Sequence, residues 1–343
     1  MSKIEREVLI EELESVIPGL SERELIEQSS CFVFSEGMVH TYNDEIACSI
    51  PCSLPITGAV RAKPLLALLH LLKDDHLEVD VAEGKLLISH GRRRASLAIE
   101  ETINLPINSI KPPKDWQKVP GKMLDALEKV QICAGKDETQ FITTCIHLDI
   151  NYVECFNNYQ AARFTIKTGL EKSILIRYTS ISHIIKLGFS KMGMTKQWLH
   201  FKNKRGLLLS TRLYIEQYRE LDQLFGREGT KISLPRKLTS AIACAEIFSS
   251  QEIDSNLVRV TIKDRRIQIQ GKGPTGEYTE SKEIQFDGER EFHIDPEVLS
   301  SLIENHSDCF IGDRSVIVKD GPFQYIAALT LSKKTKNKEK RTK

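Results

Sequence analysis

The sequence lacks the features that mark membrane proteins, secreted proteins and metalloproteins. No apolar run approaches the roughly 20 residues of a membrane-spanning helix, and Met1–Glu5 has none of the apolar core of a secretory signal. None of the eight cysteines forms a CxxC pair, and Cys48 and Cys52 have no second Cys or His pair near enough to complete a tetrahedral zinc site. We therefore expect a cytoplasmic protein with reduced cysteines and no bound metal.

Catalytic signatures are also missing. The sequence has no HExxH, no GxSxG, no P-loop and no Rossmann glycine pattern. Carboxylate pairs such as Asp74-Asp75 fall at the ends of expected helices. We expect a non-catalytic protein without a cofactor, and the alternative that stays open is a hydrolase whose site is assembled from scattered residues.

An excess of charge of either sign is absent from the chain as a whole, which has a net charge of +1. Residues 333–343 hold seven basic residues and one acidic residue, so this tail carries +6 and the preceding 332 residues carry −5. A mildly acidic body is not typical of a protein coated in nucleic-acid-binding surface, so any DNA contact must come from a local arrangement of charge. The tail has no apolar residue and is predicted to be disordered.

What the sequence does contain is one helix-and-strand unit that occurs three times, with a period of about 115 residues. Each copy is expected to begin with an amphipathic helix (5–17, 121–130, 235–248), to continue with a second helix (63–73, 180–192, 295–305) and to end with a strand–turn–strand stretch (86–99, 199–213, 309–329). Solenoid repeats have periods of about 20–50 residues. Each copy is therefore a domain.

The domain boundaries are predicted from turn-forming residues. Pro112-Pro113 marks the first boundary, and the charged, glycine-bearing stretch Gly226–Gly229 marks the second. The predicted domains are residues 1–113, 114–226 and 227–332, and the tail is 333–343. The predicted fold class is α+β, with antiparallel sheets that carry two helices per domain on one face.

Four stretches resemble one known family in the right order. Glu83–Leu97, which runs on to Asn104-Leu105-Pro106, resembles domain one of the bacterial DNA sliding clamp, the beta subunit of DNA polymerase III. Leu124–Gln140 is similar to the start of clamp domain two, Ser210–Phe225 to its end, and Asp313–Leu331 to the closing hairpin of domain three.

The resemblance implies both an assembly and its partners. Clamps of this family are head-to-tail homodimers, six domains in a ring, whose twelve helices line a hole that holds duplex DNA. The implied partners are duplex DNA, held without regard to sequence, and a DNA polymerase and a clamp loader that dock through a short peptide motif. No membrane is involved.

The chain departs from the family pattern in three places. It has Asn157-Asn158-Tyr159-Gln160 where clamps usually carry Thr-Asp-Gly-His-Arg beside the partner-binding cleft. It has Ala328-Leu329-Thr330-Leu331 and a basic tail where clamps end in a strand like Met-Pro-Met-Arg. Its first helix, expected to face DNA, carries Glu5, Glu7, Glu11, Glu12 and Glu14. These differences indicate a divergent clamp, of the kind a phage could encode, with its own partner preferences.

The candidate DNA-facing residues lie on the polar sides of the expected helices or at family positions nearby. They are Arg23, Lys63, His70, Lys73, Lys122, Lys129, Lys136, Gln140, Lys186, Lys191, Arg236 and Lys237. Lysine side chains near phosphates attract DNA without reading bases, which is what sliding requires. For each single residue the alternative is an ordinary solvated helix face. The run Arg92-Arg93-Arg94 is expected in an exposed turn away from the hole.

The resemblance also implies a cleft between domains two and three for a short apolar peptide. The residues near it by family position are Ile142, Phe164, Ile232, Ile326, Ala328 and Thr330. The alternative for each is a place in the core. Docking of a linear peptide in an apolar groove beside a strand is an established mode of recognition.

The leading hypothesis is therefore a sliding clamp that encircles duplex DNA and tethers the replicative polymerase. The alternative is a clamp-fold scaffold that recruits protein partners, for example in viral transcription, without a role in replication.

Overall fold

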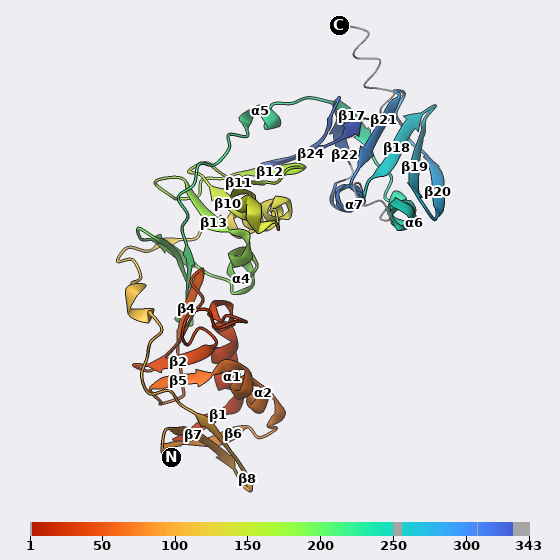
Figure 1. Ribbon diagram of the computed structural model, residues 1–343. Coiled ribbons are helices and arrows are strands. Elements are labelled where there is room, and N and C mark those ends of the chain that lie inside the picture. Colours follow the sequence, from red (N-terminus) through yellow and green to blue (C-terminus); the bar gives the residue numbers. More distant parts are fainter. Residues whose placement is uncertain (1, 250–255, 307, 332–343) are drawn as a thin grey trace. The chain divides into compact units, whose positions relative to one another are not determined.

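The computed structural model describes residues 2–249, 256–306 and 308–331, and the chain forms two compact units (Figure 1). Unit 1 comprises Met1–Gln131, Lys136–Val153 and Ile166–Gln217, and unit 2 comprises Ile132–Gly135, Glu154–Thr165 and Tyr218–Lys343. Both combine antiparallel sheets with helices, so the predicted α+β class is confirmed. The division into three domains stays a prediction. The tail 333–343, predicted to be disordered, lies outside the described residues.

Unit 1 is built on an eight-stranded antiparallel sheet of order β5-β2-β3-β4-β16-β15-β14-β9. The strands are β2 (Cys31–Ser35), β3 (Met38–Tyr42), β4 (Ile46–Pro51), β5 (Gly58–Arg61), β9 (Gln117–Lys118), β14 (Lys191–Met194), β15 (Trp198–Lys202) and β16 (Leu208–Arg212). Four successive residues of β2, from Cys31, are fully buried, as expected for a strand covered on both faces. Strands β4 and β16 are distant in sequence, and their pairing places Ala47 opposite Ser210.

A smaller sheet of order β1-β6-β7-β8 lies in the same unit. Its strands are β1 (Ser2–Glu5), β6 (His76–Ala82), β7 (Lys85–His90) and β8 (Arg93–Ala98). Leu86 and Ile88 of β7 are buried and lie opposite Leu97 and Ala95, so these two residues of β8 face the core side. Strand β8 is an edge of this sheet, with one side of its backbone unpaired in the described chain. A further pair in unit 1 is β10 (Cys145–Leu148) with β13 (Ile174–Arg177).

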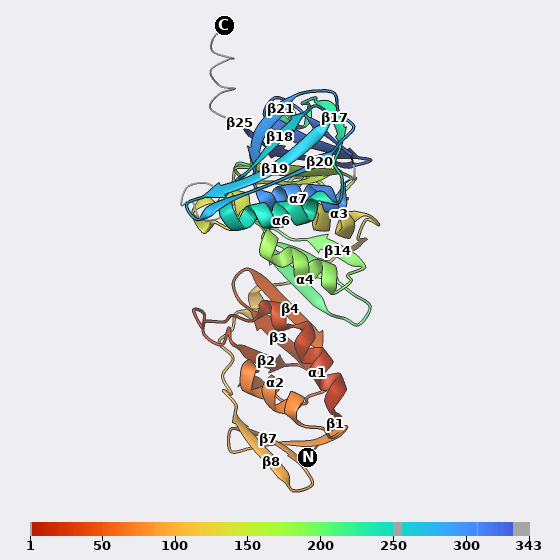
Figure 2. The same cartoon turned by 90° about the vertical axis from the view of Figure 1, so that its right-hand side faces the viewer.

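The helices of unit 1 are amphipathic. Helices α1 (Arg6–Ser15) and α2 (Ala62–Leu71) lie side by side against β2–β4 (Figure 2). Leu9 and Leu13, four residues apart, are fully buried, as are Leu65 and Leu69. Helices α3 (Met123–Val130) and α4 (Ile181–Lys186) contact each other. Short 3-10 turns are η1 (Ile17–Gly19), η2 (Ile107–Ser109), η3 (Gln131–Cys133), η4 (Glu138–Thr144) and η5 (Tyr178–Ser180).

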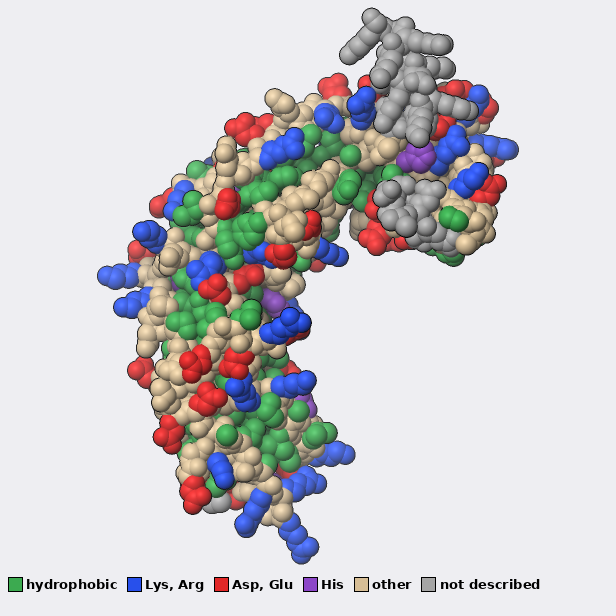
Figure 3. Space-filling view, in the orientation of Figure 1, with side chains coloured by type: hydrophobic (Ala, Val, Ile, Leu, Met, Phe, Trp, Pro, Cys, Tyr) green, Lys and Arg blue, Asp and Glu red, His purple; other side chains and the backbone are tan. Residues whose placement is uncertain are grey.

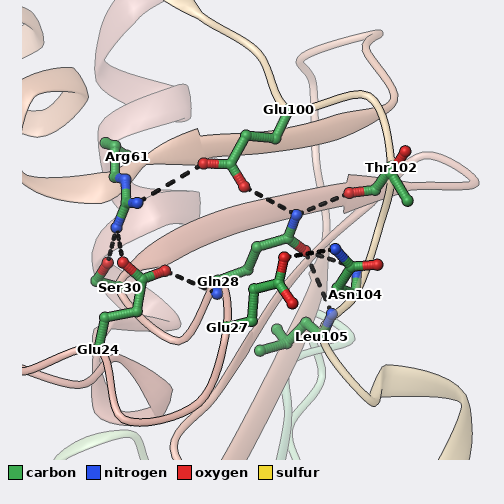
Figure 4. A network of polar contacts seen from close by, with 9 residues as sticks. All are labelled: Glu24, Glu27, Gln28, Ser30, Arg61, Glu100, Thr102, Asn104 and Leu105. Carbon is green, nitrogen blue, oxygen red and sulfur yellow. Dashed lines mark hydrogen bonds and ion pairs between the residues drawn. The ribbon is translucent and has the colours of Figure 1, made fainter.

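A buried glutamine fixes the segment that follows β8 (Figure 4). Gln28, 1% exposed, donates through Nε2 to Glu100 Oε2 (3.0 Å) and to the carbonyl oxygen of Thr102 (2.7 Å). Its Oε1 accepts from the backbone N–H groups of Asn104 (2.8 Å) and Leu105 (3.2 Å). One side chain thus satisfies several backbone groups of the segment and holds it on the body of unit 1.

Unit 2 contains two runs of paired strands. The first, of order β12-β24-β23-β22-β17, consists of β12 (Gln160–Thr165), β24 (Phe323–Ala328), β23 (Ser315–Asp320), β22 (Asp308–Ile311) and β17 (Thr230–Ser233). The second, of order β20-β19-β18-β21-β25, consists of β20 (Gly276–Glu283), β19 (Arg266–Gly273), β18 (Val258–Lys263), β21 (Arg290–Ile294) and β25 (Thr330–Leu331). Strand β11 (Tyr152–Phe156) has residues in both units.

Helices α6 (Leu238–Ser249) and α7 (Pro296–Asn305) contact each other, and α6 lies against β19 (Figure 2). The close approach depends on Gly271, because a Cβ at this position would overlap the carbonyl oxygen of Ala245. Helix α7 begins at the N-cap Asp295, whose carboxylate accepts from the N–H of Glu297 at 2.8 Å. A short helix, α5 (Asp222–Phe225), lies in the segment that precedes β17.

One expected helix is wrong in its second half. The predicted helix 180–192 ends at Lys186, and Lys191 lies on strand β14, opposite Lys202. Gly188 explains the early end, because its φ of +61° is left-handed and is typical of the residue that terminates a helix. The third-copy helix predicted over 235–248 begins later than expected, at Leu238.

Candidate functional site

Unit 2 contains an open cavity of about 270 Å³. It lies where the end of β11, the start of β12, the end of β24 and the α5 segment meet. Its lining residues are Phe156, Asn157, Asn158, Tyr159, Gln160, Ala161, Arg219, Leu224, Arg227, Ser315, Ile326 and Ala328. We call this cavity the unit 2 pocket. Its floor is apolar and its rim is polar, which is typical of a binding site.

The turn between β11 and β12 forms one wall of the pocket. The side-chain oxygen of Asn157 accepts from the backbone N–H groups of Tyr159 (2.9 Å) and Gln160 (3.0 Å), so the turn is fixed by its first residue. The backbone N–H of Ala328 then donates to the carbonyl oxygen of Tyr159 at 2.7 Å. The turn is therefore joined to the end of β24, and Tyr159 is left 73% exposed at the rim.

The floor is formed by two paired strands together with Leu224 of α5. Ala161 on β12 lies opposite Ile326 on β24, and both are buried, as is Phe156. Tyr325 donates its hydroxyl proton to Oε1 of Gln160 at 2.6 Å, and Gln160 Nε2 donates to a backbone carbonyl oxygen. Gln160 is thus held in place by bonds within the unit.

An ion-pair network that runs from the buried Glu154 to the exposed Asp222 holds α5 beside the pocket. Arg163 on β12 is bonded to Glu154 (Nη2 to Oε2, 2.7 Å) and to Asp222 (Nη1 to Oδ1, 2.7 Å), and its guanidinium lies 4.7 Å from the ring centroid of Phe225. Burial acts to lower the pKa of Arg163, but the two carboxylates outweigh it and the pKa is raised. These contacts position Leu224, the residue of α5 that lines the pocket.

Unit 1 contains a second copy of the same turn. Asn43, between β3 and β4, accepts through its side-chain oxygen from the N–H groups of Glu45 (3.2 Å) and Ile46 (2.8 Å). The strand that follows pairs with β16 as β12 pairs with β24, with Ala47 opposite Ser210. By this register Asn43 corresponds to Asn157, and Ala47 to Ala161.

In the unit 1 copy the space that would be the pocket is filled. Trp198, where unit 2 has Ser315, is 5% exposed, and its ring centroid is 6.2 Å from that of Tyr42. Arg212, where unit 2 has Ala328, places its guanidinium 4.8 Å from the Trp198 ring centroid and forms an ion pair with Asp44.

The segment that carries η2 covers the same group, because Ile107 and Ile110 pack against the cluster that contains Trp198. Only a cavity of about 30 Å³ is left there. Small side chains at 315 and 328 are therefore what leave the second copy open.

The sequence-predicted cleft residues fall in different places. Ile326 and Ala328 line the unit 2 pocket. Phe164 on β12 and Ile232 on β17 are each 1% exposed and belong to the core of unit 2, and Thr330 is exposed on β25. Ile142 lies in η4 of unit 1.

Six lining residues were neither among the candidates nor placed beside the cleft by the resemblance: Arg219, Leu224, Arg227, Ser315, Phe156 and Ala161. The resemblance of Ser210–Phe225 to the end of clamp domain two is the signal that could have found the first two.

The candidate DNA-facing residues are on the surface, and most lie at or beyond helix ends. Lys63 and His70 are on α2, Lys129 on α3 and Lys186 on α4. Lys191 is on β14 and Gln140 is in η4. The others flank helices or lie in loops: Arg23, Lys73, Lys122, Lys136, Arg236 and Lys237. Two of the group are engaged by acids, His70 by Glu14 at 3.2 Å and Lys129 by Asp125 at 3.7 Å.

The helices themselves are acidic. Helices α1, α2, α3, α4, α6 and α7 carry nine Asp or Glu residues against four Lys or Arg residues, a net charge of −5. Four of the nine acids are on α1. Any attraction of these faces for phosphates must therefore come from the basic residues at helix ends.

The described residues also bear on two other kinds of site. Among them, no three His, Cys, Asp or Glu side chains are grouped so that they could hold a metal ion. No helix within the described ranges is both long and apolar enough to cross a membrane.

The fold is that of bacterial DNA sliding clamps. The DNA polymerase III beta chain of Streptococcus pneumoniae TIGR4 matches with a TM-score of 0.83 and 16% identity, over 96% of this chain and 99% of that chain. The beta subunit of Thermotoga maritima matches with a TM-score of 0.81 and 14% identity over the same shares. A sliding clamp of Pseudomonas aeruginosa bound to griselimycin matches with a TM-score of 0.82 and 14% identity, again over 96% and 99%.

No protein-family model matches the sequence, and no curated protein matches it. The predicted clamp fold is thus confirmed by structure at 13–16% sequence identity, a level that indicates a divergent sequence.

Proposed function

We propose that this protein is a DNA sliding clamp, a processivity factor that closes around duplex DNA as a homodimer and tethers a DNA polymerase. The observation that carries the proposal is the agreement of fold with sliding clamps over 96% of the chain. The protein acts by shape, without a catalytic step or a cofactor, in the cytoplasm of a bacterium or of a phage-infected host.

The unit 2 pocket is the docking site for the polymerase and the clamp loader. A short peptide with apolar and aromatic side chains would place them on the floor formed by Phe156, Leu224 and Ile326. Affinity in the micromolar range corresponds to about 8 kcal/mol, which is reasonable for a small apolar groove. The filled copy in unit 1 supports the assignment by contrast. The same turn and strand pair leaves a cavity of about 270 Å³ in unit 2 and one of about 30 Å³ in unit 1, so the space in unit 2 is not a necessary result of this backbone arrangement.

The dimer forms through two edge strands. Edge strands expose unpaired backbone groups that invite pairing with another chain. Strand β8 begins in the run Arg92-Arg93-Arg94, and β20 carries Glu277, Glu280 and Glu283. Figure 3 shows Lys and Arg side chains gathered over the β7–β8 end of unit 1.

Some of the charges at these two edges are available for pairing, although Glu277 and Glu280 form ion pairs with Lys272 and Lys282. Within the described residues Arg92, Arg94 and Glu283 have no ion-pair partner, whereas Arg93 is bonded to Asp74 at 2.9 Å. We propose that β8 of one chain pairs with β20 of its partner. Three domains per chain (1–113, 114–226, 227–332) then give six in the closed ring.

Contact with DNA is made by the basic residues at the helix ends. Phosphate contacts hold the duplex without reading its sequence, so many equivalent positions exist and the protein can slide.

Retention on DNA tests the proposal. The protein, loaded by its cognate loader or by incubation, should stay on a nicked circular plasmid through gel filtration and should leave when a restriction enzyme linearises the plasmid. Equal retention on circular and linear DNA would contradict encirclement. A monomer at micromolar concentration in light scattering would contradict a stable preformed ring.

The acidic helices favour a second candidate, a clamp-fold scaffold that recruits protein partners, for example in viral transcription, without encircling DNA. In that case the unit 2 pocket would bind its peptide normally, but neither form of the plasmid would retain the protein.

A further inference from the structure

We propose that the unit 2 pocket selects a peptide that combines apolar side chains with carboxylates, and that Arg219 and Arg227 recognise the carboxylates. The inference rests on the proposed docking function of the pocket and states which chemistry its partner must have.

The charge of the lining is entirely positive. Arg219 and Arg227 are its only charged members, and both are exposed. Neither side chain has a hydrogen bond or an ion pair with any described residue, although Glu220 and Glu228 are their neighbours in the chain. Two guanidinium groups therefore stand at the edge of an apolar floor without an acidic partner.

The two side-chain amides at Asn157 and Gln160 are engaged by the protein itself, whereas the hydroxyls of Tyr159 and Ser315 carry no charge. The side-chain oxygen of Asn157 accepts two hydrogen bonds from the backbone of its own turn. The amide of Gln160 accepts a hydrogen bond through its oxygen and donates one through its nitrogen. The nearest arginine of β12, Arg163, is saturated by Glu154 and Asp222. The charged groups left to recognise a ligand are thus Arg219 and Arg227.

Guanidinium groups match carboxylates in geometry as well as in charge, because two parallel N–H groups can bond both oxygens of one carboxylate. The floor, with Leu224 and Ile326, requires apolar side chains from the same ligand. Nucleic acid could supply anionic phosphates, but it has no aliphatic side chains to cover this floor. An acidic and apolar peptide is therefore the ligand that fits both features.

The experiment compares three fluorescein-labelled octapeptides with one Leu-Leu-Phe core, flanked by two Asp, two Asn or two Lys residues. Binding to the full-length protein is measured by fluorescence anisotropy at low and high salt. The Asp peptide should bind about tenfold more tightly than the Asn peptide, since an exposed ion pair contributes about two- to fivefold. The Lys peptide should bind most weakly, and high salt should reduce the differences.

Two variants assign the effect to the arginines. In Arg219→Gln/Arg227→Gln the Asp and Asn peptides should bind equally, with the affinity of the Asn peptide nearly unchanged. The control Arg265→Gln/Arg266→Gln removes the same charge from unit 2 outside the pocket, and it should keep the tenfold preference.

The outcomes separate this inference from the proposed function. Equal binding of all three peptides to the unmodified protein overturns the inference and leaves docking intact. Failure of all three to bind overturns docking and the inference with it. To test competition for the arginines, a short DNA duplex is added to the bound Asp peptide. Displacement of the Asp peptide from the unmodified protein and from the Arg265→Gln/Arg266→Gln control, but not from Arg219→Gln/Arg227→Gln, would assign the arginines to phosphates and overturn the inference as well.

Discussion

At the scale of single residues, two positions contribute to the difference between the open and the filled copy of one junction, and the η2 segment covers the filled copy. Trp198 and Arg212 fill the copy in unit 1, and Ser315 and Ala328 leave the copy in unit 2 empty. The turns that precede them have the same hydrogen bonds, made by Asn43 and by Asn157. Backbone geometry is thus retained while side-chain volume decides whether a ligand can enter.

A large side chain at position 315, like Trp198 at the matching position of unit 1, should therefore fill the unit 2 pocket. We expect Ser315→Trp to reduce the affinity of an apolar peptide at least tenfold, because the indole would occupy the space that the peptide needs. Anisotropy titration measures the affinity, and thermal unfolding checks that the unit is intact. Lys319→Trp, an exposed position on the same strand, is the control and should bind normally. Unchanged affinity in Ser315→Trp would mean that the peptide binds elsewhere.

A buried histidine makes the stability of unit 1 depend on pH. His200 is fully buried, with ring nitrogens 2.7 Å from Ser210 Oγ and 3.0 Å from Thr195 Oγ1, and burial lowers its pKa from 6.5 to about 4. The unfolded chain binds a proton below pH 6.5 while the folded chain does not, so stability falls as the pH drops from 6.5 toward 4. The loss amounts to about 3 kcal/mol at most.

Urea unfolding at pH 7 and at pH 4.5 measures this loss. Carboxylates also titrate in this range, so the informative quantity is the difference between the original protein and His200→Gln. We expect the variant to be less stable at pH 7 and to lose less stability on acidification. An identical loss in both proteins would show that His200 does not titrate differently in the two states.

At the scale of elements, apolar spacing in the sequence predicted the helices because that signal is local. Leu9 and Leu13 show a buried stripe whatever lies opposite. The end of α4 was missed because it depends on the left-handed conformation of Gly188, and the sequence of Lys186–Lys191 by itself is compatible with a helix.

The residues of the unit 2 pocket likewise divide into those that a local sequence signal could predict and those whose position depends on distant contacts. Ile326 and Ala328 came from resemblance in one continuous strand. Arg219 and Arg227 lie in the connecting segment that contains α5. The position of this segment depends on the ion pair between Asp222 of α5 and Arg163 of β12, and no local sequence pattern encodes a contact between residues so far apart in the chain.

The edge strands give a prediction about assembly. In the proposed β8–β20 joint we place Arg94 opposite Glu283, because neither has an ion-pair partner among the described residues. Arg94→Glu would then put two like charges face to face, and we expect the dimer dissociation constant to rise about tenfold. The double variant Arg94→Glu/Glu283→Arg should restore the original value. Analytical ultracentrifugation gives the constants, and Lys3→Glu on the opposite edge strand β1 is the control. A double variant as weak as the single one would exclude this pair from the joint.

At the scale of the whole molecule, acidic helices and basic helix ends predict a modest dependence of DNA association on salt. Charge reversal at Lys122, Lys186 and Lys237 should weaken association, and each lost phosphate contact should lower the slope of log K against log salt by about 0.9. Reversal at Lys111, Lys167 and Lys319, three exposed lysines that lie in no helix and are not candidate DNA-facing residues, is the matched control. Equal slopes in both triple variants would show that the first three residues do not face DNA.

The filled junction of unit 1 limits how many partner proteins the proposed dimer could bind at the same time. Because Trp198 and Arg212 fill one of the two junctions compared among the described residues, one junction per chain stays open, and the proposed dimer would have two. A polymerase and one further enzyme could then be held simultaneously, but a third would have to wait for one of them to leave. Exchange of partners would be governed by their dissociation rates. An inhibitor that bound tightly in both unit 2 pockets would prevent every partner from binding.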